Sequence, residues 1–251
     1  GLGLESLALD PEFSFFGQMD RLNPSMQPLF GVFVSKHDAV ASEITFGGHS
    51  TERVMEELQW APVTQPELGY WQLQVRGITV GGEPLDLCAE GDCIAIADTG
   101  TSLLGVPKQA AQHVHWLLAR KVAGDPFQAP DCREHPGPDI VFDLGEVQLT
   151  VGPEEYSRPA GLRVINNKTN ETELICRASL LPVEESAALS PKTWILGEPV
   201  LRKYYTTYDW RQKRVGFALA AQPLPDPTAV MRHRVVGAPP AEPPTPTVVY
   251  I

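Results

Sequence analysis

Short apolar or alternating runs, separated by glycine and polar turn residues, recur along most of the chain. This spacing is typical of β-strands joined by tight turns. The run Ile78–Val80 is followed by Gly81 and Gly82, which predict a hairpin because glycine readily adopts the positive φ angles of a tight turn. The pattern therefore predicts an all-β domain. The further segments expected as strands are 29–34, 43–46, 58–63, 70–75, 94–97, 139–144, 147–151, 206–209 and 214–219.

One longer segment has the spacing of a helix. It begins near Pro107, runs to about Val122 and has Gly124 as its expected stop. Its apolar side is expected to pack behind the strand that ends at residue 97. The residues predicted to share that side are Ala110, Val114, Leu117, Leu118 and Lys121. Two shorter helical segments are expected at 13–19 and 198–204.

The composition limits the classes of partner. The chain has 251 residues, and its apolar content of 43% is enough for a substantial core. A net charge of −11 argues against a nucleic-acid partner, because no basic stripe is available to neutralise phosphates. It is compatible with an acidic lumen, where carboxylate protonation lowers self-repulsion. No apolar run approaches the about 20 residues of a membrane span, so none is expected.

Candidate chemistry is concentrated after the apolar run Ile94–Ala97, which leads directly into Asp98-Thr99-Gly100-Thr101-Ser102. A carboxylate at the end of a buried strand costs free energy unless it is hydrogen-bonded or has a chemical role. Asp98 alone could simply order a turn through its own side chain. A second apolar run that ends in glycine, Trp194–Gly197, favours the functional interpretation.

These two segments, together with others in the same order, resemble the pepsin-like aspartic peptidases. The matching segments are 1–4, 46–48, 69–72, 96–104, 138–142, 194–197, 202–209 and 214–218. The resemblance extends from Gly1 to about Ala220. It implies a mainly β lobe, a β-barrel-like sandwich with a few short helices. The family has two lobes that each donate one Asp-Thr-Gly, and this chain carries only the second.

The resemblance also implies a domain organisation. Residues 1–28 are expected to be a remnant of the N-terminal lobe and the connection between lobes, and residues 29–221 the C-terminal lobe. Residues 222–251 are rich in proline and poor in core-forming residues, so a disordered or extended tail is expected there.

By this resemblance, Asp98 is one of two catalytic aspartates. Gly100 lets the backbone approach its carboxylate, since glycine has no Cβ. Thr101 and Ser102 are expected to hydrogen-bond the carboxylate or its neighbours, and Thr99 to reach the matching threonine of the other lobe. The two aspartates would share one proton and activate water for peptide-bond hydrolysis at acidic pH.

Three further residues match family positions that line the substrate cleft: Tyr70, Ile96 and Ile195. Ordinary core packing is the alternative interpretation of each. A nucleophilic mechanism is not indicated, because the chain has no Gly-x-Ser-x-Gly elbow.

The four cysteines allow three pairings. The resemblance implies Cys88–Cys93 and Cys132–Cys176. Disulfides indicate an oxidising compartment. The cysteines lack histidines at zinc-site spacing, and the histidines at 113 and 115 diverge on a helix, so neither a metal nor a cofactor is expected.

Two overlapping glycosylation sequons begin at Asn167 and Asn170, in a polar stretch. With the disulfides they indicate the secretory pathway, ending in an acidic vacuolar or lysosomal lumen or outside the cell.

The sequence therefore predicts an aspartic endopeptidase lobe that acts on proteins or peptides only with a complementary N-terminal lobe, from the same precursor or a separate chain. The alternative is a catalytically inactive single lobe that binds peptides or a protein. A third hypothesis is a homodimer in which two copies of Asp98 form the pair.

Overall fold

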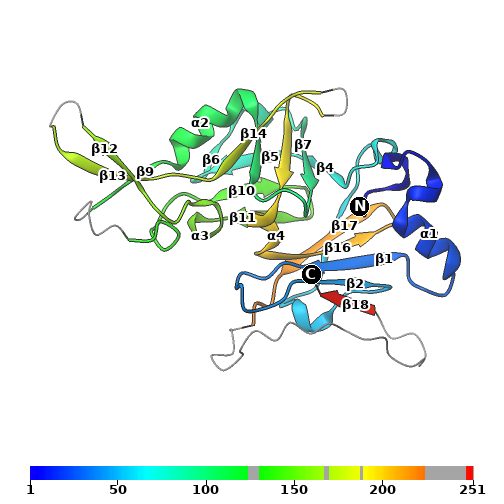
Figure 1. Cartoon of the computed structure of the whole chain (residues 1–251). Helices are drawn as coiled ribbons and strands as arrows, with labels where there is room; N and C mark the ends of the chain where they lie inside the picture. The colour runs from blue at the N-terminus through cyan, green and yellow to red at the C-terminus, as the bar shows by residue number, and fades with distance from the viewer. Residues whose placement is uncertain (124–129, 167–169, 187–188, 224–246, 251) are drawn as a thin grey trace. The chain divides into compact units, whose positions relative to one another are not determined.

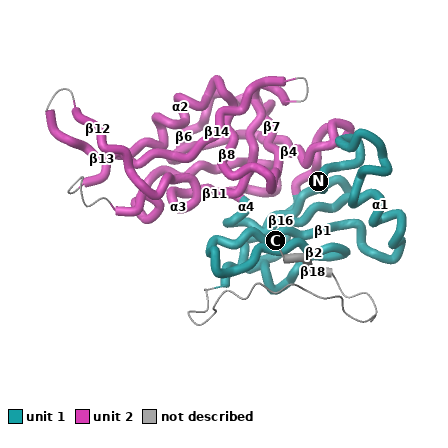
Figure 2. Tube along the Cα trace, in the orientation of Figure 1, with its two compact units in different colours: residues 1–60, 201–251 teal, residues 61–200 magenta. Residues whose placement is uncertain are grey.

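The computed structural model describes residues 1–123, 130–166, 170–186, 189–223 and 247–250. This part of the chain is mainly β-sheet with a few short helices, which confirms the predicted fold class (Figure 1). The chain divides into two compact units, one formed by residues 1–60 and 201–251 and the other by residues 61–200 (Figure 2).

The first unit contains a six-stranded sheet in the order β18-β2-β1-β16-β17-β3. Its strands are β1 (Leu29–Phe33), β2 (Glu43–Phe46), β3 (Gln59–Pro62), β16 (Tyr204–Asp209), β17 (Arg214–Leu219) and β18 (Thr247–Tyr250), of which β3 begins in this unit. Strand β1 pairs antiparallel with both β2 and β16. The edge strand β18 comes from the segment expected to be a disordered or extended tail. Residues 224–246 of that segment lie outside the described residues.

Aromatic side chains form much of the core of this unit. The helix α1 (Phe15–Leu22) contributes Phe16, which is fully buried. Its ring centroid lies 5.2 Å from that of Phe30 on β1 and 5.2 Å from that of Trp210. Phe30 in turn stacks on Tyr208 of β16, with the ring centroids 4.7 Å apart. These contacts join the helix to the sheet by burying large apolar surfaces.

The second unit contains three sheets, with the strand orders β14-β8-β15-β7-β4, β11-β10-β5-β6 and β12-β13-β9. Their strands are β4 (Gln72–Val75), β5 (Gly77–Val80), β6 (Glu83–Pro84), β7 (Cys93–Ala97), β8 (Leu104–Pro107), β9 (Arg120–Val122), β10 (Ile140–Asp143), β11 (Gln148–Val151), β12 (Leu162–Ile165), β13 (Thr172–Cys176), β14 (Leu180–Val183) and β15 (Thr193–Leu196). The helices are α2 (Lys108–Leu118), α3 (Pro153–Tyr156) and α4 (Glu198–Leu201), the last ending at the unit boundary. Short 3₁₀ helices occur at Glu5–Leu7, Pro11–Phe13, Thr51–Arg53, Pro66–Leu68 and Asp86–Cys88.

The predicted Gly-Gly hairpin is present between β5 and β6. Gly81 has φ 62° and Gly82 has φ 89°, so both residues adopt the conformation that favours glycine. The strands pair antiparallel on either side of the turn. This local prediction is confirmed.

The long helix ends earlier than predicted. Helix α2 stops at Leu118, Ala119 is extended, and Arg120–Val122 forms β9, which pairs antiparallel with β13. The expectation that Lys121 belongs to the helix is wrong, and Gly124 lies outside the described residues. Val122 is 5% exposed and belongs to one apolar cluster with Leu174 and a disulfide. Burial and pairing with a distant strand therefore outweigh the local helical pattern.

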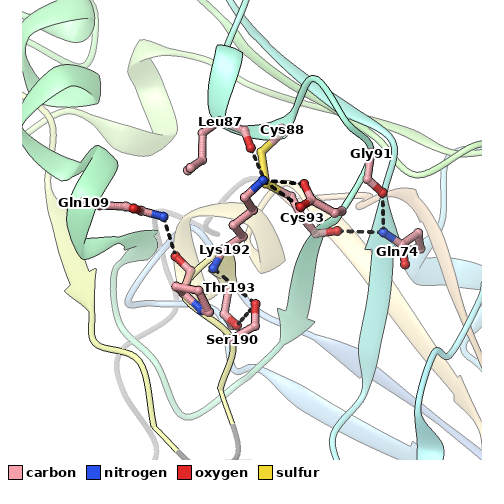
Figure 3. The surroundings of a disulfide bond; sticks show 11 residues. Gln74, Leu87, Cys88, Gly91, Cys93, Gln109, Ser190, Lys192 and Thr193 are labelled. Atoms are coloured by element: carbon pink, nitrogen blue, oxygen red, sulfur yellow. Dashed lines mark hydrogen bonds and ion pairs between the residues drawn. A yellow bond between two sulfur atoms is a disulfide. The ribbon is translucent and has the colours of Figure 1, made fainter.

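Both disulfides implied by the resemblance are present, Cys88–Cys93 and Cys132–Cys176. Figure 3 shows how side chains outside the small loop 88–93 hold it. The Gln74 amide donates to two of its carbonyl oxygens, at 2.6 and 3.0 Å. The Lys192 Nζ is 2.6 Å from a carboxylate oxygen of Asp92. The loop directly before β7 is therefore anchored by covalent and polar contacts.

Both sequons begin between β12 and β13, which form a hairpin where only a polar stretch was expected (Figure 1). Asn167 lies outside the described residues. Asn170 is exposed, which glycosylation requires. Within the described ranges, no helix is both long and apolar enough to cross a membrane.

Candidate active site

The two apolar runs singled out in the sequence lie side by side in the second unit. Strands β7 and β15 pair in parallel, with Ile96 opposite Ile195 and Ala97 opposite Leu196. Because parallel strands end at the same edge of a sheet, the turns that follow them are brought together. The Asp98 N–H donates to the carbonyl oxygen of Leu196 at 3.2 Å, so pairing continues into the first turn.

The Asp98 carboxylate is half-buried and held through both of its oxygens. The Gly100 N–H donates to Oδ1 at 2.9 Å, and the Thr101 hydroxyl donates to Oδ2 at 2.6 Å. Hydrogen bonds to an ionised acceptor are among the stronger ones in proteins. Each oxygen still has accepting capacity, because a carboxylate oxygen can take more than one donor. The carboxylate is thus fixed in orientation while part of it remains accessible.

The glycine of the triplet lies close against the carboxylate. A Cβ added at Gly100 would lie 3.3 Å from Asp98 Oδ1, closer than most such contacts. The residue before the turn is held as well, since the Ala97 N–H donates to the Trp71 carbonyl oxygen at 3.1 Å. The local backbone is therefore arranged around the carboxylate.

A contact that the sequence analysis missed joins this turn to the one after β15. A Cβ added at Gly197 would overlap with the carbonyl oxygens of Thr101 and Leu103. The Glu198 N–H donates to the Thr101 carbonyl oxygen at 2.8 Å. The two turns therefore pack backbone against backbone, and only glycine fits at 197. The signal in the sequence was the glycine that closes the second apolar run.

The other residues of the predicted site have different surroundings. Thr99 and Ser102 are exposed. Among the described residues, the donors to the Asp98 carboxylate are Gly100 and Thr101, and the Ser102 hydroxyl is not one of them. Ile96 is only 6% exposed and belongs to the core. Tyr70, just before β4, and Ile195 are half-buried. The described His, Cys, Asp and Glu residues do not gather in any group of three that could hold a metal ion.

The comparison with known proteins agrees with this geometry. The family described as "Eukaryotic aspartyl protease" matches residues 1–220, so the chain belongs to this family. It is 30% identical to Pepsin A-5 of Mus musculus over 221 residues, covering 88% of this chain and 53% of that protein. It is 33% identical to Gastricsin of Macaca fuscata fuscata over 225 residues, covering 88% and 55%.

In a third relative, too, the match covers about half of the relative's length. The chain is 33% identical to Cathepsin E of Rattus norvegicus over 224 residues, covering 88% of this chain and 52% of that protein. The chain therefore spans about half the length of the curated relatives that it matches.

Proposed function

We propose that this chain acts as the C-terminal lobe of an aspartic endopeptidase and that Asp98 supplies one of its two catalytic carboxylates. The proposal rests on one observation, the half-buried carboxylate fixed through both oxygens at the shared end of two parallel strands. In this proposal residues 29–221 are the lobe, and residues 1–28 are the last part of the N-terminal lobe and the connection.

The second aspartate comes from a complementary N-terminal lobe, either in the same precursor or as a separate chain. Two carboxylates held close together share one proton, because like charges disfavour the doubly ionised state. The ionised member takes a proton from water, and the water oxygen bonds to the substrate carbonyl carbon. The protonated member gives its proton to the carbonyl oxygen. As the C–N bond breaks, the carboxyl that took the water proton gives it to the leaving nitrogen, and the other carboxylate takes a proton from a hydroxyl of the diol intermediate, which restores the shared proton.

The remaining residues of the predicted site receive supporting roles. The exposed Thr99 contacts the complementary lobe, as the exposure of its side chain permits. Thr101 orients the Asp98 carboxylate, and Ser102 extends the polar edge of the turn. Tyr70 and Ile195 contact a peptide or protein substrate, with Ile96 packed directly beside Ile195.

The two disulfides fit a secretory or extracellular location, since such bonds persist in oxidising compartments. We assign the activity to an acidic vacuolar or lysosomal lumen or to an acidic extracellular space. There the pair of carboxylates retains its shared proton.

The assembly can be tested by measuring the native mass and the acid proteolysis of the protein purified from its own source. We expect either a complex with a second fragment or a single larger chain, with hydrolysis of a denatured protein substrate that increases toward acidic pH. An inactive monomer of 27.5 kDa would contradict the proposal and favour a peptide-binding module.

The hydroxyl of Thr101 provides a second test in the assembled enzyme. Thr101→Val removes the hydroxyl that donates to Asp98 Oδ2 at 2.6 Å, so this carboxylate oxygen loses its hydrogen bond from residue 101. A hydrogen bond to a charged group is worth about 1.5–3 kcal/mol, so we expect kcat/KM to decrease about 10- to 100-fold. Thr101→Ser keeps the hydroxyl and should retain most activity. Equal activity in the Val and Ser variants would refute a positioning role.

A further inference from the structure

A concave site lies in the unit formed by residues 61–200, at the C-terminal end of α2. It has a volume of about 410 Å³. Its polar lining is His115, Arg158 and Arg177, and Trp116, Ala119, Ile175 and Ala178 contribute apolar atoms. We call these seven residues the arginine pocket. None of them belongs to the Asp98 site.

Strand pairing places the two arginines next to each other. Ser157 and Ala178 form an antiparallel bridge, and the Arg158 N–H donates to the Arg177 carbonyl oxygen at 3.0 Å. Like charges on directly opposite residues of paired strands are destabilising. Within the described residues, neither guanidinium forms a salt bridge with a carboxylate. The fold thus holds two cations together without an acidic partner among those residues.

The pocket contains two more signs of an unbalanced positive charge. The pKa of His115 is lowered, first by burial and then by the charges of Arg158 and Arg177. The Nε of Arg177 is buried and has no hydrogen-bond partner. An unpaired buried donor normally costs free energy. The C-terminal end of α2 offers only about half a negative charge, which does not balance two full positive charges.

An exposed aromatic side chain borders these cations. Trp116 is 73% exposed on α2, and Ile175 on β13 is half-buried. Large exposed apolar side chains beside positive groups suit a ligand with both an apolar body and an anionic group. Arginine forks match the geometry of phosphate and carboxylate oxygens.

We propose that the arginine pocket binds a small organic oxyanion, a phosphate or carboxylate group carried on an aromatic or apolar body. The oxyanion lies between Arg158 and Arg177 and accepts from their guanidinium N–H groups. The body of the ligand packs on Trp116 and Ile175. This inference is independent of the function proposed for Asp98.

The test is calorimetric titration of the full 251-residue chain at neutral pH and low salt. The probes are phenyl phosphate and phenylacetate, with phenol as the uncharged analogue and inorganic phosphate as the anion without a body. We expect saturable binding of at least one aromatic anion at millimolar concentration or below, weaker binding of inorganic phosphate and none of phenol. The ratio between the two aromatic anions distinguishes a phosphate ester from a carboxylate. Absence of saturable binding by both would overturn the proposal.

Matched variants localise the binding. Arg158→Gln and Arg177→Gln should each weaken it at least about tenfold, as expected for the loss of a charge-assisted hydrogen bond. Arg133→Gln is the control, because Arg133 is exposed, lies outside the pocket and pairs with Asp131. Undiminished binding in both pocket variants, or an equal loss in the control, would place the ligand elsewhere.

Thermal unfolding without ligand separates this role from a structural one. If the two arginines bind a ligand and do not stabilise the fold, the Arg158→Gln variant should unfold at the same or a higher temperature. The substitution removes the repulsion between the Arg158 and Arg177 charges. A marked decrease in its unfolding temperature would indicate a structural role and contradict the proposal. If Arg177→Gln does not fold, the exposed Arg158 is sufficient for both measurements.

Discussion

Replacing Asp98 by asparagine is expected to reduce acid proteolysis by the assembled enzyme about 1000-fold, within the range for loss of a general acid or base. The amide has nearly the shape of the carboxylate and can still accept from the Gly100 N–H. It cannot take a proton from water or share one with a second carboxylate. In the unsubstituted chain the Thr101 hydroxyl donates to Asp98 Oδ2, and the NH₂ group of an asparagine cannot accept that hydrogen bond. The measurement is kcat/KM for a peptide substrate across acidic pH.

The chain contains a matched control for this substitution. Asp143 is also half-buried, and its Oδ1 accepts from the Gly145 N–H at 2.8 Å, two residues along the chain. Asp143→Asn therefore changes the same kind of turn away from the Asp98 site and should retain activity. If Asp98→Asn and Asp143→Asn are equally active, Asp98 only orders a turn and the proposed function is wrong.

The second large effect is expected at Gly197. Gly197→Ala places a methyl group where the carbonyl oxygens of Thr101 and Leu103 already lie. These are backbone atoms of a turn held by hydrogen bonds, so they cannot move aside as a flexible side chain would. We expect the free energy of unfolding to decrease by about 3 kcal/mol or more, at or above the upper end of the usual cost of overpacking. Chemical denaturation of the chain measures this loss.

Gly77→Ala is the matched control in the same unit, since a Cβ added at Gly77 meets nothing within 4 Å. Its free energy of unfolding should change by less than about 1 kcal/mol. Any Gly197→Ala protein that folds should also lose activity in the assembled enzyme, because the Asp98 turn must shift. Equal stability of the two alanine variants would show that the turns after β7 and β15 do not pack against each other.

The candidate site could be predicted in part from local pattern. An apolar run followed by Asp-Thr-Gly-Thr specifies a strand and a turn in which nearby donors reach the carboxylate. The bonds from Gly100 and Thr101 are of this short range. The requirement at Gly197 could not be derived in the same way, because the atoms that exclude a Cβ belong to residues 101 and 103.

The C-terminal end of α2 is decided by tertiary contacts and not by the local sequence pattern. The pattern predicts helix to about residue 122, and the chain leaves the helix after Leu118. Pairing of β9 with β13 and the burial of Val122 beside the Cys132–Cys176 disulfide decide the outcome. A local pattern contains no information about a strand about 50 residues away. Helix propensity is therefore overridden where tertiary burial contributes more free energy than the propensity does.

The sequence by itself determined the features that depend on neighbouring residues. These are the mainly β character, the Gly81-Gly82 hairpin and the Asp98 turn. Only the tertiary structure decided which distant segments meet: the parallel pairing of β7 with β15, the end of α2 and the adjacency of Arg158 and Arg177. The physical reason is that turns and strands follow from short-range sterics and hydrogen bonding. Long-range pairing is selected by the burial of apolar surface across the whole fold.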